Sequence, residues 1–235
     1  MKSVLITGAS KGLGRAFFDY FLAHGWIVFP LVRDPSVARE MEDSAPKGRC
    51  YPRIADVQHS DAQESVERAL AAVGVLDLLI NNAGIPGRSA GLLNTSAEET
   101  QELFNTHVVG ALRITRAAMP FLLNAKEPTV VNISSRLASL TKSAAGEFSS
   151  RGFSYTYRIA KAAQNMLSVC LAEEFGPKGV AVLAIHPGQF LGESSASGAK
   201  NSAAEAAASI VDWLNMNRKL DKVQFTQPNV EDIPW

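Results

Sequence analysis

Hydrophobic residues in this chain gather in short, unbroken runs that alternate with longer segments of mixed polarity. The runs are rich in Val, Ile and Leu and show little alternation of apolar and polar residues, which is typical of strands covered on both faces of a sheet. They predict strands at residues 3–7, 26–32, 50–54, 76–81, 129–134 and 179–185, with a weaker seventh at 222–226. The mixed segments predict helices at residues 12–24, 61–73, 97–123, 155–175 and 203–215.

This order of elements predicts an α/β fold, a Rossmann-type doubly wound parallel sheet of about seven strands with helices on both faces. No repeat, low-complexity tract or linker interrupts the pattern, so we expect a single domain over residues 1–235. Ligands of such sheets bind beyond the carboxyl ends of the strands. We therefore expect the functional residues to follow the strands directly.

Composition narrows the class of protein. Among 235 residues, 23 Lys and Arg balance 23 Asp and Glu, so the chain has no global attraction for nucleic acid or anionic membrane. The longest aliphatic run, Val180 to Ile185, is far shorter than the ~20 residues that span a bilayer. The apolar start ends at Gly8, too early for a signal peptide. We expect a cytoplasmic protein with neither a nucleic-acid nor a membrane partner.

The two cysteines, Cys50 and Cys170, lie in apolar surroundings and form neither a disulfide framework nor a CxxC pair. We expect both to be reduced residues of the core.

A glycine-rich turn, Thr7-Gly8-Ala9-Ser10-Lys11-Gly12-Leu13-Gly14, follows the first strand and opens a helix. Glycines there permit a tight turn and let the backbone approach a pyrophosphate at the helix N-terminus. The spacing is not that of a P-loop, because no Gly-Lys-Ser/Thr follows. The spacing also fits the GxSxG nucleophile elbow of hydrolases. That elbow needs an oxyanion-hole N–H from a loop after an earlier strand, and no strand precedes this turn other than the one it follows. A structural turn without a ligand is the remaining alternative.

Tyr157 and Lys161 are four residues apart, which places both side chains on one face of a helix. A nearby ammonium favours the phenolate and lowers the pKa of a tyrosine, which suits proton exchange near neutrality. The alternative is a partly buried ion-and-ring pair on a helix surface. Ser135 ends the fifth strand, where its hydroxyl either binds a substrate carbonyl oxygen or caps local backbone.

The spacing TGxxxGxG resembles that of the short-chain dehydrogenase/reductase family, and further family motifs follow in order. Asn81-Asn82-Ala83-Gly84 matches NNAG, Asn132-Ile133-Ser134-Ser135 ends at the catalytic serine, Tyr157 and Lys161 form YxxxK, and Pro187-Gly188 follows the sixth strand. The matches run from residue 4 to about 188, so they cover most of the chain.

The resemblance implies a role for each matching position. Catalysis would involve Ser135, Tyr157, Lys161 and His107. Cofactor binding would involve Gly8, Ser10, Lys11, Gly12, Leu13, Gly14, Arg33, Asp56, Val57, Asn82, Ala83, Gly84, Tyr157, Lys161, Pro187 and Gly188. Reduced nicotinamide would deliver hydride to a carbonyl carbon while Ser135 holds the oxygen and Tyr157 protonates it. Lys161 would tune Tyr157 and contact the nicotinamide ribose.

Two cationic side chains, Arg33 and Lys11, indicate which nicotinamide cofactor the chain would prefer. NAD-preferring relatives place Asp at the end of the second strand, where this chain has Val32 followed by Arg33. Lys11 adds a second cation inside the glycine turn. Together they favour a 2′-phosphate and hence NADP(H), unless both are merely solvated surface charges. We expect Asp34 to point away or to pair with Arg33.

Two positions depart from the family pattern. His107 stands where the family usually carries Asn, three residues before Gly110, and we expect it to keep the backbone carbonyl that leads through water to the lysine. No histidine has the spacing of a metal ligand, so no metal site is expected. Gly192 replaces the Thr that usually binds the nicotinamide carboxamide, and Ser194, Ser195 or backbone would substitute.

Ser135 and Tyr157 are 22 residues apart, farther than is usual in the family, and residues 136–154 predict a loop near the site. This insertion, the run to Asn165 and the final Ile233-Pro234-Trp235 resemble the C-factor/sniffer-like carbonyl reductases. That resemblance implies NADPH-dependent reduction of small-molecule ketones, aldehydes or quinones. Residues 189–201 would form a mobile substrate lid.

The family usually associates through the predicted helices at 97–123 and 155–175, which implies a homo-oligomer, a dimer or tetramer. His107 and Gly192 keep open a second reading, a catalytically weak NADP-binding regulatory or signalling protein on the same fold. A lyase or isomerase on this scaffold is a third. The sequence does not identify the substrate, because loops shape the pocket.

Overall fold

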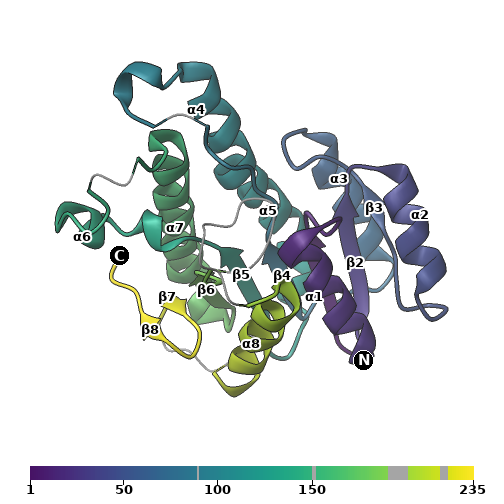
Figure 1. The fold of residues 1–235 in the computed structure, drawn as a ribbon. Coiled ribbons are helices and arrows are strands. Elements are labelled where there is room, and N and C mark those ends of the chain that lie inside the picture. Colours follow the sequence, from purple (N-terminus) through teal and green to yellow (C-terminus); the bar gives the residue numbers. More distant parts are fainter. Residues whose placement is uncertain (89, 150–151, 190–200, 218–221) are drawn as a thin grey trace.

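The computed structural model describes residues 1–88, 90–149, 152–189, 201–217 and 222–235. Its centre is an eight-stranded sheet in the order β3-β2-β1-β4-β5-β6-β7-β8 (Figure 1). The strands are β1 (Ser3–Thr7), β2 (Ile27–Val32), β3 (Arg53–Ile54), β4 (Leu78–Asn81), β5 (Thr129–Ile133), β6 (Ala181–Ile185), β7 (Gln224–Gln227) and β8 (Glu231–Asp232). All neighbours pair in parallel except β7 and β8. The strand order reverses between β1 and β4, the point at which such sheets bind ligands.

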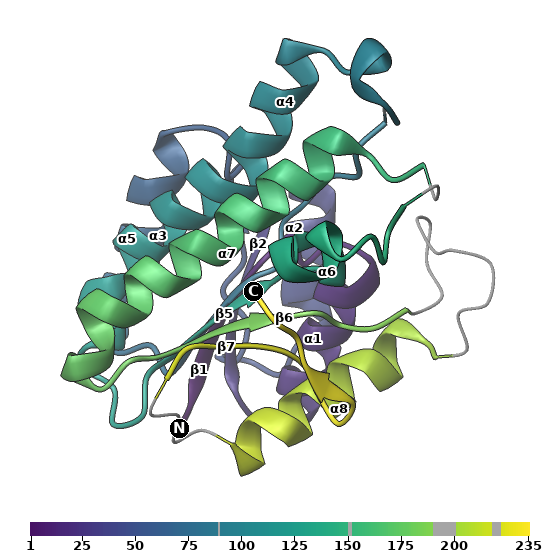
Figure 2. The same cartoon turned by 90° about the vertical axis from the view of Figure 1, so that its left-hand side faces the viewer.

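Helices cover both faces of the sheet (Figure 2). The α-helices are α1 (Gly12–Ala23), α2 (Pro35–Ser44), α3 (Asp61–Ala71), α4 (Ala97–Phe104), α5 (Gly110–Leu122), α6 (Leu140–Ala144), α7 (Tyr155–Phe175) and α8 (Ala203–Met216). Val4 and Ile6 of β1 pack into the layer formed by α1, α2 and α8, whereas Leu5 packs against α3 and α5. This period of two buries both faces and explains why the strands are apolar throughout.

The doubly wound fold is confirmed, but several predicted boundaries were wrong. The sheet has an eighth, antiparallel strand that the pattern did not indicate. The predicted strand 50–54 shrinks to β3, with only an isolated bridge between Val28 and Cys50 before it. Helix α2 was not expected, because its segment is largely polar. It forms because Asp34 caps its N-terminus, accepting from the Ser36 N–H at 2.8 Å, and Pro35 occupies the first turn.

The single helix predicted at 97–123 is interrupted. Helices α4 and α5 are joined by a π-helical turn, η2 (Asn105–Val109). Extra residues of this kind are common at functional sites. Residues 136–154 are also not a plain loop, since they contain a 3-10 turn, η3 (Arg136–Ala138), and the short helix α6.

Only one of the two cysteines is a core residue. Cys50 is buried, and burial raises the pKa of its thiol to about 12. Cys170 is exposed on α7, so the prediction that it belongs to the core was wrong. Within the residues described, no helix is both long enough and apolar enough to cross a membrane.

Candidate active site

The glycine turn between β1 and α1 is tight because two of its glycines touch other backbone. A Cβ on Gly8 would lie 2.9 Å from the Cα of Ala83, and one on Gly14 would lie 2.1 Å from the Gly8 carbonyl oxygen. Gly12 differs, since a Cβ there would meet nothing within 4 Å, although its φ of +56° still favours glycine. Helix α1 begins without a side-chain N-cap hydrogen bond. The turn therefore offers an open backbone surface at a helix N-terminus, which suits a phosphate.

Residues after β4 brace this turn. The Thr7 hydroxyl accepts from the N–H groups of Asn82 and Ala83 at 3.0 and 2.9 Å. The Asn82 side-chain amide donates to the carbonyls of Thr7 and Gly8 at 3.0 and 3.1 Å. Ser10 and Lys11 are exposed at the turn, whereas Leu13 is buried beneath it. The NNAG segment thus fixes the backbone that a cofactor would contact.

The cation after β2 lies beside the turn. The Leu31 carbonyl accepts from the N–H groups of Gly8 and Ala9, which brings Arg33 to the same edge of the sheet. Arg33 has a 71% exposed side chain, and its Nη1 lies 3.4 Å from Oδ2 of Asp56. Val57 beside Asp56 is buried. An exposed pair of this kind contributes little to stability, so a phosphate can compete for the guanidinium.

Asp34 does not pair with Arg33. Its carboxylate accepts from both the N–H and the hydroxyl of Ser36 at the start of α2, and these bonds lower its pKa. The alternative that it points away from Arg33 agrees with this helix-capping geometry.

Ser135, Tyr157 and Lys161 lie together beyond the end of β5. The Ser135 hydroxyl faces the Tyr157 phenol closely enough to lower the pKa of that phenol. Lys161 is buried, with Nζ 5.9 Å from the centre of the Tyr157 ring. Its ammonium donates to the Ile133 carbonyl at 2.6 Å and to Oε1 of Gln164 at 2.9 Å. The structure therefore brings together the three residues that the sequence indicated from two separate elements.

Burial shifts the pKa values of Tyr157 and Lys161. It raises the pKa of Tyr157, and the Ser135 hydroxyl opposes that rise. Burial also lowers the pKa of Lys161 to about 7. The prediction that the ammonium lowers the pKa of Tyr157 was wrong, because burial raises that pKa. Lys161 donates to a backbone carbonyl and an amide instead of the phenol, and both groups lose hydration.

His107 packs edge-on against the same tyrosine. The ring centroids are 5.6 Å apart and the planes meet at 89°. Nε2 lies 2.9 Å from the Ile85 carbonyl oxygen and 3.4 Å from the Ile85 nitrogen. Burial, with the charge of Lys161 second, lowers the pKa of His107 to about 3 and keeps the ring neutral. Within the described chain, its buried Nδ1 has no hydrogen-bond partner, and no cluster of His, Cys, Asp or Glu is arranged to hold a metal ion.

His186-Pro187-Gly188 follows β6 at the same edge. Gly188 has a φ of +78°, and a Cβ there would press on the Gln227 amide. Burial, with the charge of Arg136 second, lowers the pKa of His186 to about 4. Gly192, Ser194 and Ser195, and with them nearly all of the expected lid, lie outside the residues described.

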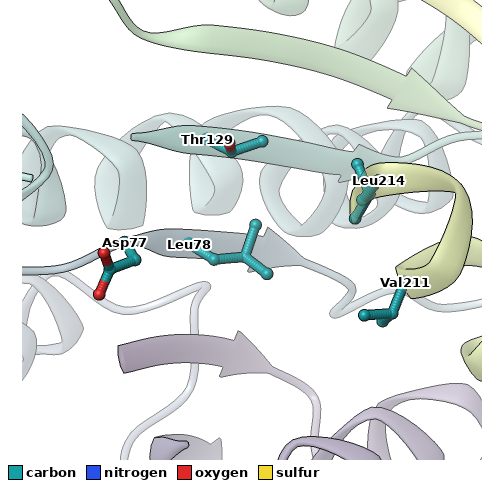
Figure 3. A pocket seen from close by; sticks show the side chains of 5 residues that line it. All are labelled: Asp77, Leu78, Thr129, Val211 and Leu214. Carbon is teal, nitrogen blue, oxygen red and sulfur yellow. The ribbon is translucent and has the colours of Figure 1, made fainter. Parts of the chain in front are cut away.

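The cavity in Figure 3 is not part of this site. It is lined by Asp77, Leu78, Thr129, Val211 and Leu214. Leu78 and Thr129 begin β4 and β5, so the cavity lies at the opposite ends of the strands from Ser135, Tyr157 and Lys161. Its one carboxylate already accepts from the Ser3 N–H at 2.8 Å.

The family model described as short chain dehydrogenase matches residues 2–203, and these include the glycine turn, the catalytic group and the Pro-Gly pair. The chain belongs to the short chain dehydrogenase family. The expected family is thereby confirmed, and the protein is an oxidoreductase of that family.

Relatives agree with this assignment. The "Short chain dehydrogenase pigC" of Monascus ruber is 32% identical over 196 residues, a match that covers 80% of this chain and 62% of pigC. The NADPH-bound carbonyl reductase from chicken fatty liver superimposes with a TM-score of 0.84 at 27% identity, covering 100% of this chain and 99% of that one. Carbonyl reductase Sniffer of D. melanogaster, at 22% identity and full coverage of both chains, shares the fold with a TM-score of 0.85.

A buried polar network supports the short chain dehydrogenase site, and the sequence did not indicate it. The Asn81 amide donates to Oδ1 of Asn132 at 2.9 Å and to the Thr115 hydroxyl at 3.0 Å. The Asn132 amide then donates to the Ser168 hydroxyl at 2.8 Å. These bonds tie β4, β5, α5 and α7 together below the catalytic group. The sequence signal that could have indicated this network is an asparagine near the end of each of two otherwise apolar strands. In the sheet, Asn81 of β4 is paired directly with Asn132 of β5.

Proposed function

We propose that this protein is an NADPH-dependent reductase that converts a carbonyl group of a small molecule, in a ketone, aldehyde or quinone, to an alcohol. The observation that carries the proposal is the grouping of Ser135, Tyr157 and buried Lys161 at the edge of the sheet that also holds the glycine turn. A hydroxyl pair and a buried cation are the groups needed to bind and protonate a carbonyl oxygen.

The residues present fit NADPH. Gly12 leaves room for a pyrophosphate at the start of α1, and Arg33 supplies a planar cation for a 2′-phosphate. Gly84 and Gly188 would border the nicotinamide end. The chicken carbonyl reductase, solved with NADPH bound, supports this choice of cofactor.

When bound, NADPH supplies the hydride that reduces the carbonyl carbon. Ser135 donates a hydrogen bond to the carbonyl oxygen and so holds it beside Tyr157. Tyr157 would then give its phenolic proton to that oxygen. The phenolate left behind then lies near Lys161, whose Nζ is 5.9 Å from the centre of the Tyr157 ring.

The direct experiment follows NADPH oxidation by absorbance across a panel of ketones, aldehydes and quinones, with NADPH affinity measured in parallel. The proposal expects steady turnover of at least one compound class. Tight NADPH binding without any turnover would instead favour the regulatory protein.

Arg33 gives a prediction about cofactor choice. Arg33→Ala should lower kcat/KM for NADPH about 30-fold and leave that for NADH within about twofold, because a charge-assisted bond to the 2′-phosphate is lost. Arg68→Ala is the matched control, since Arg68 is also exposed and pairs with a carboxylate, Glu64. Steady-state kinetics with both cofactors checks this, and an equal loss with NADH would contradict it.

We also propose that copies of the chain associate through α4, α5 and α7. Exposed apolar side chains on these helices support this, with Phe104, Leu112, Ile159 and Met166 between 40% and 61% exposed. Light scattering on a size-exclusion column should give a dimer or tetramer, and Met166→Glu should shift it toward the monomer. A monomeric wild type at assay concentration would contradict the proposal.

A further inference from the structure

The buried ring of Phe148 contacts the two arginines that directly follow Ser135 and Tyr157. Phe148, in the segment between η3 and α7, is only 4% exposed. The guanidinium carbon of Arg136 lies 5.9 Å from the centre of its ring, and that of Arg158 lies 6.0 Å away. Arg136 directly follows Ser135, and Arg158 directly follows Tyr157.

These contacts join two elements that must stay in register. Ser135 follows β5 and Tyr157 belongs to α7, so the approach of their two hydroxyls depends on how the helix sits against the strand end. A guanidinium within about 6 Å of a ring centre is attracted to its face. In the described part of the chain, neither arginine has a carboxylate within ion-pair distance. Phe148 is therefore the shared partner of both.

The segment that carries Phe148 is itself anchored. Phe153 meets Phe148 edge-on at 6.0 Å. Earlier in the same segment, the Ser139 hydroxyl donates to the Pro234 carbonyl at 2.5 Å and the Thr141 N–H donates to the Trp235 carbonyl at 2.9 Å. Figure 2 shows the C-terminal end of the chain beside α6. The segment that carries Phe148 is thus tied to the C-terminal residues as well as to the two arginines.

We propose that Phe148 is a positioning residue, which holds the hydroxyls of Ser135 and Tyr157 beside each other by contacting the arginines that follow them. This inference rests on the proposed carbonyl reduction and gives the long segment between the two residues a role in it. Phe148 touches neither substrate nor cofactor in this proposal and acts only through its neighbours.

Phe148→Leu tests the proposal, because leucine keeps most of the apolar volume but lacks the ring face. We expect kcat to fall about tenfold while KM for NADPH stays within about twofold, as misplacement of catalytic groups lowers the rate of the chemical step. Phe148→Trp keeps an aromatic face, so its kcat should stay close to that of the wild type. Phe148→Met is the second apolar variant if the leucine variant does not fold.

A second measurement needs neither turnover nor cofactor. The groups facing Tyr157 are Ser135, neutral His107 from η2 and Lys161 from its own helix. Movement of the Ser135 hydroxyl away from the phenol should raise the pKa of Tyr157 further, because that hydroxyl favours the phenolate. Carbon-13 NMR of ring-labelled tyrosine can follow this, since the chain has only four tyrosines and Tyr157→Phe assigns the signal.

Phe175→Leu is the matched control. Lys178 lies 4.5 Å from the centre of the Phe175 ring at the far end of the same helix, so this variant also removes a cation–ring contact. It should leave kcat and the pKa of Tyr157 unchanged. An unchanged pKa in Phe148→Leu, or an equal loss of kcat in Phe175→Leu, would overturn the inference. A wild type without turnover would contradict the proposed function, while the NMR result would still decide the role of Phe148.

Discussion

Tyr157→Phe should lower kcat for carbonyl reduction about a thousandfold while the Kd for NADPH stays within about twofold. The substitution removes only the phenolic hydroxyl, which is the proton donor in the proposed reaction and the partner of Ser135. The ring remains to pack against His107, so the shape of the site is kept. Turnover assays and NADPH fluorescence titration measure the two quantities.

Tyr155→Phe is the control for that result. Tyr155 lies two residues earlier on α7 with a 44% exposed side chain, and it has no part in the proposed chemistry. Its variant should match the wild type in both assays. Turnover of Tyr157→Phe at the wild-type rate would remove Tyr157 from the mechanism.

Lys161→Met should lower kcat about a hundredfold and also change how stability depends on pH. Burial lowers the pKa of Lys161 from 10.5 to about 7, so between these pH values the unfolded chain binds a proton that the folded chain has released. The wild type therefore gains stability as pH rises from 7 to 10. Methionine binds no proton, so the free energy of unfolding of the wild type should gain about 4 kcal/mol relative to the variant over this range.

Urea unfolding of both proteins at several pH values between 7 and 10 measures this difference. Lys178→Met, which replaces an exposed lysine just beyond the end of α7, should stay parallel to the wild type throughout. Curves for Lys161→Met that run parallel to the wild type would show that Lys161 titrates no differently in the folded protein.

The fold was predictable where burial alone dictates it. Strands β1, β4, β5 and β6 are apolar on both faces, and this pattern is visible in the sequence. The break between α4 and α5 was not predictable, because the mixed pattern of apolar and polar residues runs through the π-helical turn at Asn105–Val109 without interruption. Helix α2 buries little apolar surface, and its start depends on the local cap formed by Asp34.

Some features of the candidate site were likewise predictable from the sequence, and others were not. Motif spacing indicated Ser135, Tyr157 and Lys161 because the carboxyl ends of parallel strands meet at one edge. Spacing carries no information on hydration, so it gave the wrong direction for the pKa of Tyr157. The contacts of Phe148 with Arg136 and Arg158 depend on tertiary packing of a segment with no regular periodicity.

The central claim is that the protein transfers hydride from NADPH to a carbonyl carbon. The most direct test incubates the enzyme with a turned-over carbonyl compound and NADPH deuterated at the transferable position, and analyses the alcohol by mass spectrometry. We predict one deuterium on the carbinol carbon with the wild type and almost no alcohol with Tyr157→Phe. Consumption of NADPH that leaves no deuterium in the alcohol would contradict the claim.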